Sequence, residues 1–200
     1  MRKISLLAAV LSLAILSACS GNDGKPEPPA PEPGALTVTF DFEKQSGYAS
    51  NQFAVWIEDM EGNLIKTLYA TKFTANGGYK NRPNSLSLWV EKSGLASMTK
   101  SEVDAVSGAT PKAGAVFYAW DLTDQNGGSV TPGEYRFIVE GSLRWKNRVL
   151  YTGVVDVSGG AAAVQGNAEY IYEASDEQPA LSENAAESNM IGAVTAIWEP

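Results

Sequence analysis

Apolar and polar residues alternate over most of the chain after residue 35, and this period of two constrains the fold more than any other feature. Residues 36–42 (LTVTFDF) alternate cleanly, whereas residues 52–58 (QFAVWIE) are almost continuously apolar, which is typical of a central strand buried on both faces. Further strands are predicted at residues 64–69, 87–91, 115–120, 134–141, 148–156, 167–172 and 191–198. Residues 97–106 fit a short helix with Ser101 as its N-cap. The pattern predicts an all-β fold, an antiparallel sandwich of about eight or nine strands with one short helix.

The first residues have the layout of an export signal. Arg2 and Lys3 precede an apolar run at residues 6–16, which is too short to span a bilayer. The Leu-Ser-Ala-Cys sequence that follows ends at Cys19 and resembles the lipobox of bacterial lipoproteins. The resemblance implies that residues 1–18 are removed and that Cys19 carries a lipid anchor. The alternative is an ordinary secretory signal with a chance cysteine. Because Cys19 is the only cysteine, the chain cannot form an intramolecular disulfide.

Composition divides the mature chain into a stalk and one domain. Residues 19–35 contain five prolines and predict a semi-rigid, extended spacer. Residues 36–200 are enough for one well-packed domain. Residues 173–200 carry six acidic residues and no basic one, which predicts an acidic loop at about 174–189; the alternative is a wholly disordered tail. Ser20 stands where an aspartate marks inner-membrane retention in some bacteria, so the outer membrane is favoured as the site of the anchor.

Composition also excludes several classes of function. The chain has 23 acidic and 15 basic residues and no histidine. Without histidine there can be no Ser-His-Asp triad, no zinc site built on histidine and no His-ligated haem. The sequence has no basic patch interleaved with aromatic residues, so a nucleic-acid partner is not predicted. Ser107 lacks a histidine base and the chain contains no Gly-x-Ser-x-Gly, so a hydrolase is not predicted.

The turn at residues 119–135 is typical of a particular class of sandwich. Its W-D-x-x-D-x-x-G and P-G-x-Y sequences resemble the Ig-like domain of flagellar hook-capping proteins, which implies an Ig-like fold. Asp121 and Asp124 are expected to accept hydrogen bonds from backbone amides across the turn. Gln125 is expected to contribute almost nothing to stability. Asp124 and Asn126 lack the remaining ligands of a calcium loop, so no metal site is predicted. The residues expected to share one core are Val55, Ile57, Trp120, Tyr135 and Phe137.

Five blocks in a fixed order extend the resemblance to a whole family. The blocks are residues 55–62, residues 66–68, a tryptophan strand at 88–89, residues 104–114 and the turn with its P-G-x-Y strand. Together they resemble a family of predicted periplasmic proteins known as domain of unknown function 2271, over roughly residues 36–157. The resemblance implies the fold and an envelope location, but it implies no activity.

Residues 104–110 (DAVSGAT) carry the main functional hypothesis. They fit D-x-x-[ST]-G-A-[ST], which resembles the acceptor motif of proteins that carry FMN on a threonine through a phosphoester bond. The resemblance implies that Thr110 accepts FMN from a periplasmic flavin transferase, and that Asp104, Ser107, Gly108 and Ala109 complete the acceptor motif. Gly108 and Ala109 would allow the transferase to approach the backbone closely. The following proline keeps Thr110 out of helical geometry, so its hydroxyl is expected at the surface.

Other interpretations stay open on the sequence alone. The same stretch fits a helix C-terminus closed by Gly108 and stopped by Pro111. Functionally, the first interpretation is an electron carrier whose partner is a membrane redox protein. The second is a non-enzymatic Ig-like module that binds or scaffolds another envelope protein. Trp89 and Trp145 either flank a flavin or are buried core residues.

Overall fold

The computed structural model describes residues 32–45, 51–142, 147–171 and 190–200. The predicted signal peptide, Cys19, the stalk before residue 32, Trp145 and the predicted acidic loop at 174–189 lie outside these residues. Within the described ranges, no helix is long and apolar enough to cross a membrane.

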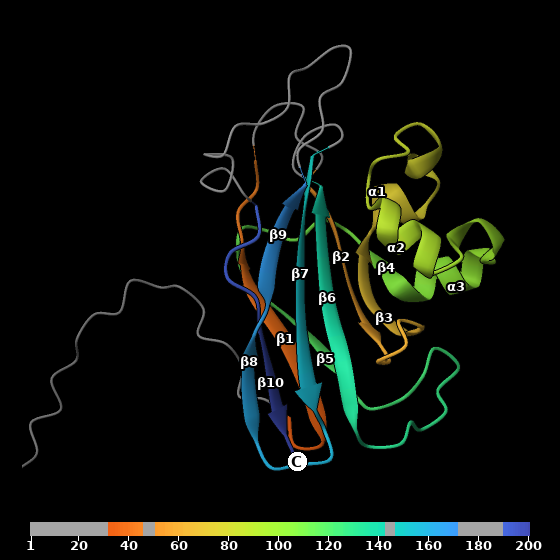
Figure 1. Ribbon diagram of the computed structural model, residues 1–200. Coiled ribbons are helices and arrows are strands. Elements are labelled where there is room, and N and C mark those ends of the chain that lie inside the picture. Colours follow the sequence, from red (N-terminus) through yellow and green to blue (C-terminus); the bar gives the residue numbers. More distant parts are fainter. Residues whose placement is uncertain (1–31, 46–50, 143–146, 172–189) are drawn as a thin grey trace, which may run out of the picture.

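Two β-sheets form the body of the domain (Figure 1). The four-stranded sheet has the order β5-β1-β10-β8, and the six-stranded sheet has the order β4-β3-β2-β6-β7-β9. The strands are β1 (Ala35–Phe42), β2 (Gln52–Glu58), β3 (Leu64–Thr71), β4 (Ser107–Gly108), β5 (Gly114–Trp120), β6 (Glu134–Ser142), β7 (Arg148–Asp156), β8 (Ala162–Gln165), β9 (Asn167–Ile171) and β10 (Thr195–Glu199). Neighbouring strands pair antiparallel, except that β3 and β4 run parallel. The larger sheet is therefore mixed, which the sequence did not predict.

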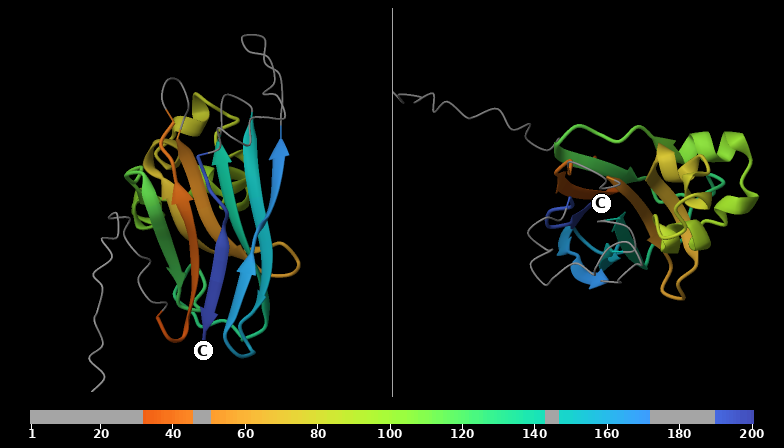
Figure 2. Two further views of the ribbon diagram at one scale, coloured as in Figure 1. Left: turned by 90° about the vertical axis from the view of Figure 1, so that its left-hand side faces the viewer. Right: turned by 90° about the horizontal axis from the view of Figure 1, so that it is seen from above.

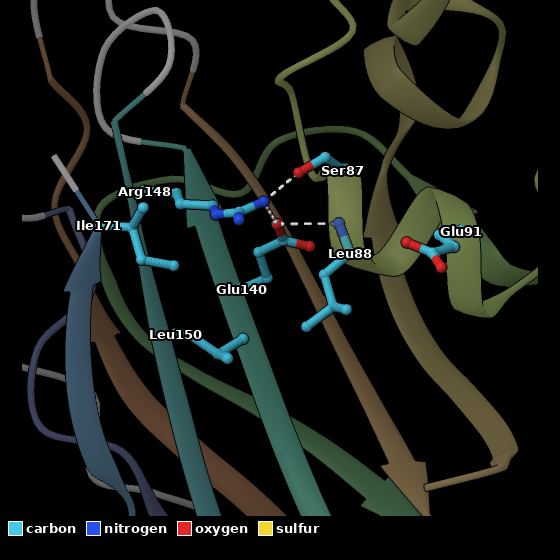
Figure 3. Close-up of a pocket in the computed structure, with 7 residues that line it drawn as sticks. All are labelled: Ser87, Leu88, Glu91, Glu140, Arg148, Leu150 and Ile171. Atoms are coloured by element: carbon cyan, nitrogen blue, oxygen red, sulfur yellow. Dashed lines mark hydrogen bonds and ion pairs between the residues drawn. The ribbon is translucent and has the colours of Figure 1, made fainter. Parts of the chain in front are cut away.

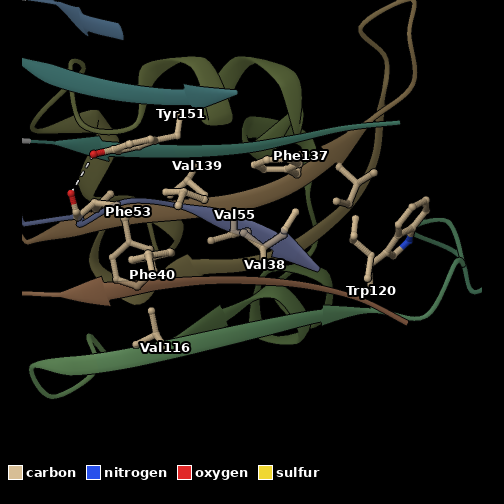
Figure 4. Packing of buried hydrophobic residues seen from close by; sticks show 14 of the residues in the cluster. Val38, Phe40, Phe53, Val55, Val116, Trp120, Phe137, Val139 and Tyr151 are labelled. Atoms are coloured by element: carbon tan, nitrogen blue, oxygen red, sulfur yellow. Dashed lines mark hydrogen bonds between the residues drawn. The ribbon is translucent and has the colours of Figure 1, made fainter. Parts of the chain in front are cut away.

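The main hydrophobic core lies between the two sheets. Figure 4 shows side chains of β1 and β5 pointing toward those of β2, β6 and β7. The predicted core residues Val55, Ile57, Trp120, Tyr135 and Phe137 all belong to this core, so that prediction is confirmed. Alternation identified them because successive side chains of a strand point to opposite faces of the sheet.

Both faces of β2 are buried, as its apolar sequence predicted. Val55 and Ile57 face the main core, whereas Ala54 and Trp56 belong to a second core on the outer face of the larger sheet. A helical layer covers this second core. Its elements are α1 (Lys72–Ala75), η1 (Gly78–Lys80), α2 (Ser87–Lys92), η2 (Leu95–Ser97) and α3 (Lys100–Val106). Seen from above in Figure 2, the helices lie on one side of the sandwich.

The predicted strand at residues 87–91 is wrong, because this segment forms helix α2. Leu86 and Trp89 are completely buried in the second core. Leu86 is the N-cap of α2 and Trp89 lies in its first turn, so both reach the second core, whereas a strand would place residues three apart on opposite faces of the sheet. The prediction of a single short helix is also wrong, because the described chain contains three short α-helices.

Three further predictions about strands need correction. Strands β4 and β8 were not predicted, because two residues (β4) and the sequence Ala-Ala-Val-Gln (β8) give too little alternation to recognise. The last strand, predicted at 191–198, is β10 at Thr195–Glu199. Ile191 forms an isolated bridge with Phe42 instead. The described chain has ten strands rather than eight or nine.

The turn after β5 is held by the two predicted aspartates. Asp124 Oδ1 accepts hydrogen bonds from the backbone N–H groups of Asn126 and Gly128, both at 2.8 Å. Asp121 Oδ1 accepts one from Lys66 Nζ at 2.8 Å, and this bond is the main reason that the pKa of Asp121 is lowered to about 2. Gln125 makes a contact that the sequence did not suggest. Its Oε1 accepts a hydrogen bond from the N–H of Thr67 at 2.9 Å, next to a register shift between β2 and β3.

Candidate functional site

Helix α3 leads directly into the predicted acceptor motif. Its N-cap is Thr99 rather than the predicted Ser101: the Thr99 hydroxyl accepts a hydrogen bond from the N–H of Glu102 at 3.3 Å, and the Glu102 carboxylate accepts one from the N–H of Thr99 at 2.6 Å. Such a capping box fixes where a helix begins. Val103 and Val106 are buried against the larger sheet, which leaves Asp104 exposed on the opposite side. Asp104 is therefore accessible to a partner protein.

The helix ends because the chain joins the sheet at β4. Ser107 has extended backbone angles (φ −118°, ψ 145°), and the next residues pair with β3 in the register Ala70↔Ser107 and Thr71↔Gly108. Gly108 does not have a positive φ, so the alternative of a helix closed by a left-handed glycine is wrong. Within the motif, Ser107 and Gly108 form a short edge strand that leads into an irregular segment at residues 109–113.

Tyr69 explains the glycine of the motif. A Cβ added at Gly108 would lie 2.7 Å from Cε2 of the Tyr69 ring, so no larger residue fits without a shift. The Tyr69 hydroxyl donates a hydrogen bond to the carbonyl oxygen of Ala109 at 2.6 Å. Burial raises the pKa of Tyr69 to about 12, so its hydroxyl stays protonated and remains a donor at neutral pH. The ring and the hydroxyl together fix the backbone just before Thr110.

Tyr69 is itself held by other aromatic side chains. Its ring stacks on Tyr118 of β5 with centroids 4.8 Å apart, and it lies 5.2 Å from the ring of Phe53 in the main core. Tyr69 comes from the larger sheet and Tyr118 from the smaller one. The stack therefore ties the acceptor motif to the core between the two sheets. The sequence offered one signal for this contact, which is an aromatic residue at the end of a strand.

The two hydroxyls of the motif differ in accessibility. Ser107 Oγ is buried and has no hydrogen-bond partner. Among the described residues, every other buried side-chain nitrogen or oxygen has a partner. Thr110 is half-buried and its side chain also has no hydrogen-bond partner within the described ranges, but its Oγ1 is not among the fully buried atoms without a partner, so at least part of this oxygen is open to solvent. Of the two oxygens, Ser107 Oγ is the one that is fully buried.

The acceptor motif lies at the far end of the domain from the start of β1, which the predicted stalk precedes in the chain. The N–H of Gly34 donates to the carbonyl oxygen of Glu199 at 2.7 Å, so β1 begins beside the C-terminal strand. At its other end, Phe42 of β1 pairs with Gly114, which directly follows the irregular segment. Eight residues of extended strand separate the two ends by roughly 24 Å. Figure 1 shows the C-terminus at the opposite end from α1.

A second feature is a hollow of about 230 Å³ on the outer face of the larger sheet (Figure 3). It is lined by Ser87, Leu88, Glu91, Glu140, Arg148, Leu150 and Ile171. Glu140 is completely buried and accepts hydrogen bonds from the N–H groups of Leu88 at 3.3 Å and Trp89 at 2.8 Å. Arg148 lies 3.7 Å from Glu140 and donates a hydrogen bond to Ser87.

Glu140 joins the helical layer to the sheet. Burial raises the pKa of its carboxyl, and the two N–H donors and Arg148 oppose that shift. The donors belong to the first turn of α2, whose backbone N–H groups have no partner within the helix. Sequence reasoning missed this residue, although an acidic residue inside the apolar strand YRFIVEGS was a recognisable signal. The polar groups of the hollow are thus used in holding α2 against β6.

The described residues do not suggest a metal centre. No group of three or more His, Cys, Asp or Glu side chains within them is placed to hold a metal ion. The chemical group that the candidate site offers is the Thr110 hydroxyl, which follows a backbone segment held by Tyr69. Trp89 lies completely buried in the second core, and its Nε1 donates to Thr67 at 3.1 Å, so it does not flank the acceptor motif as a flavin contact.

Replacing Tyr69 by phenylalanine is expected to loosen the acceptor motif. The variant keeps the ring over Gly108 but loses the hydrogen bond to Ala109, which should lower the free energy of unfolding by about 1 kcal/mol. Urea denaturation measures this cost, and amide exchange should become faster at residues 107–112. Tyr118→Phe is the matched control, since the Tyr118 hydroxyl has no hydrogen-bond partner among the described residues. Equal effects of the two changes would show that the hydrogen bond does not hold the motif.

Comparison with known proteins places the chain in a family. The model of a family described as "Predicted periplasmic protein (DUF2271)" matches residues 35–172, which is more than half of the chain. The match begins at the first residue of β1 and contains the helical layer and the acceptor motif. No curated protein and no solved structure matches the chain. The chain belongs to the DUF2271 family of predicted periplasmic proteins.

Proposed function

We propose that this periplasmic-family protein is a lipid-anchored electron carrier that holds FMN covalently on Thr110. The observation that carries the proposal is the contrast between the two hydroxyls of the motif: Thr110 is accessible, whereas Ser107 Oγ is buried. The resemblance to flavin acceptors selects Thr110 on sequence grounds alone. The structure supports the same residue for an independent, steric reason.

Attachment requires a flavin transferase and FAD as the co-substrate. The Thr110 oxygen attacks the phosphorus of the FMN half of FAD, the phosphoanhydride bond breaks, and AMP leaves. The hydroxyl proton passes to a base of the transferase, and the product is a phosphodiester between Thr110 and the ribityl chain. Asp104 is exposed on α3 and is available for recognition by the transferase. Tyr69 holds the backbone at Ala109, so the acceptor enters the transferase with little conformational entropy left to lose.

The position of Thr110 suits a carrier that exchanges electrons away from its own anchor. When bound, the isoalloxazine supplies the capacity to accept and release electrons. The anchor is proposed at Cys19, preferably in the outer membrane, and Gly34, which directly precedes β1, lies at the end of the domain opposite to the acceptor motif. The chain's own contribution is to hold the backbone just before Thr110, through the pairing of β4 with β3 and the hydrogen bond from Tyr69 to Ala109. A membrane redox protein is the proposed electron partner.

The experiment is to co-express the exported chain with a flavin transferase and supply FAD. The protein should gain the mass of one FMN less water, and it should fluoresce in a denaturing gel, because a phosphodiester survives unfolding. A known acceptor protein serves as the positive control under the same conditions. If the control gains the mass and this chain does not, the proposal is wrong.

The alternative is a non-enzymatic binding or scaffolding module with an Ig-like fold. The observation that favours it is the architecture, since sandwiches of this kind serve many binding functions. In that case the motif would be a structural edge strand, and Gly108 would be explained entirely by the Tyr69 ring. A chain that stays unmodified in the co-expression experiment would support this alternative.

A further inference from the structure

Phe73 is a large hydrophobic side chain that is exposed to solvent. In the described chain it is the most exposed residue of this kind, with 48% of its surface accessible. The ring is nevertheless supported. A Cβ added at Gly78 would lie 2.6 Å from Cε1 of Phe73, so one side of the ring rests against the backbone at Gly78. An aromatic ring that is supported on one side and open on the other can stack with a planar ligand.

The register of the sheet places Phe73 near Thr110. Thr71 of β3 pairs with Gly108 of β4, and because these strands are parallel, both chains leave the sheet at the same end. Phe73 comes two residues after Thr71, and Thr110 comes two residues after Gly108. Helix α1 also lies against β4. Strand spacing and residue lengths limit the Cα separation of Phe73 and Thr110 to about 18 Å, which is comparable to the length of an extended FMN.

Two cations flank this end of the sheet. Lys72 directly precedes Phe73, and Lys112 follows Thr110 by two residues; both side chains are exposed. A phosphodiester on Thr110 carries one negative charge, which nearby lysines would partly neutralise. An exposed aromatic ring with exposed lysines next to it in the chain and close to Thr110 in the chain suits a planar cofactor with an anionic arm better than it suits a purely apolar partner.

We propose that Phe73 is the platform on which the isoalloxazine of a Thr110-linked flavin stacks. This inference rests on the proposed function. It adds the place where the ring lies, and it accounts for an exposed phenylalanine and its supporting glycine. The occupant is the protein's own flavin, held by the linkage to Thr110, rather than a second protein.

Quenching of flavin fluorescence by acrylamide tests the proposal, because acrylamide is neutral and insensitive to the lysines. In the full chain flavinylated at Thr110, Phe73→Ala should raise the quenching constant about twofold, since the change uncovers one of the two faces of the isoalloxazine. Phe73→Tyr should keep the wild-type bimolecular quenching constant, which is the measured quenching constant divided by the fluorescence lifetime of the variant. Val154→Ala is the matched control, because Val154 is also an exposed large hydrophobic residue (39%) but lies on β7. It should leave quenching unchanged.

A second arm of the experiment does not depend on the transferase. Because Cys19 is the only cysteine, a Cys19→Ser, Thr110→Cys variant of the full chain can be labelled at residue 110 with a thiol-reactive isoalloxazine. If the wild type accepts no FMN, the proposed function fails, but this conjugate still reports whether Phe73 shields the ring. Unchanged quenching in both arms overturns the platform. The proposal is also overturned if Phe73→Ala slows attachment by the transferase but leaves quenching unchanged, because Phe73 would then be a contact for the transferase and not for the flavin.

Discussion

Thr110→Ala is expected to abolish covalent flavin attachment completely. The accessible hydroxyl of the motif is lost, and the remaining one, Ser107 Oγ, is buried where a transferase cannot reach it. Intact mass and in-gel fluorescence after co-expression with the transferase measure the result. Asp104→Ala should weaken attachment without abolishing it, because Asp104 is exposed and serves recognition rather than bond formation.

Ser107→Ala is the matched control for this experiment. It removes a hydroxyl that is buried without a partner, so the folded state should not be destabilised. We expect it to retain most of the attached flavin. If Ser107→Ala abolishes the signal while Thr110→Ala retains it, the assignment of the two hydroxyls is reversed.

Phe137→Ala is expected to have the largest effect on stability. Phe137 is completely buried between the sheets, and its removal should lower the free energy of unfolding by about 3–5 kcal/mol through lost burial and the cavity that remains. Urea or guanidinium denaturation gives the value directly. This is a large share of the total stability of a domain, which is typically about 5–15 kcal/mol.

Gln125→Ala is the comparison on the exposed turn. Sequence reasoning expected no cost, but the side-chain oxygen accepts a hydrogen bond from the N–H of Thr67, so a cost of about 1 kcal/mol is now expected. A cost as large as that of Phe137→Ala would mean that the turn, and not the main core, dominates stability. No measurable cost would mean that water replaces the glutamine at Thr67.

The sandwich could be predicted from the sequence because the alternation of apolar and polar residues is a local pattern. Alternation assigns each residue of a strand to one face, and this was enough to find the central position of β2 and the shared core of Val55, Trp120 and Phe137. It failed for α2, where Ser-Leu-Trp-Val-Glu-Lys reads equally well as a strand. That segment is stabilised as a helix by contacts far away in the chain, among them Glu140 on β6, which is 51 residues from Trp89 and accepts hydrogen bonds from two N–H groups of the first turn.

The candidate site, like the fold, was predictable from the sequence only in part. The sequence by itself determined that Asp104 to Thr110 carries an acceptor-like motif and that the chain contains neither histidine nor a second cysteine. Only the tertiary structure decided which hydroxyl is accessible, why the motif needs Gly108, and which aromatic side chain lies at the same end of the sheet. The physical reason is that these properties arise from contacts between residues far apart in the chain. Tyr69 reaches Ala109 across 40 positions, and the β3–β4 register that places Phe73 near Thr110 leaves no local pattern in the sequence.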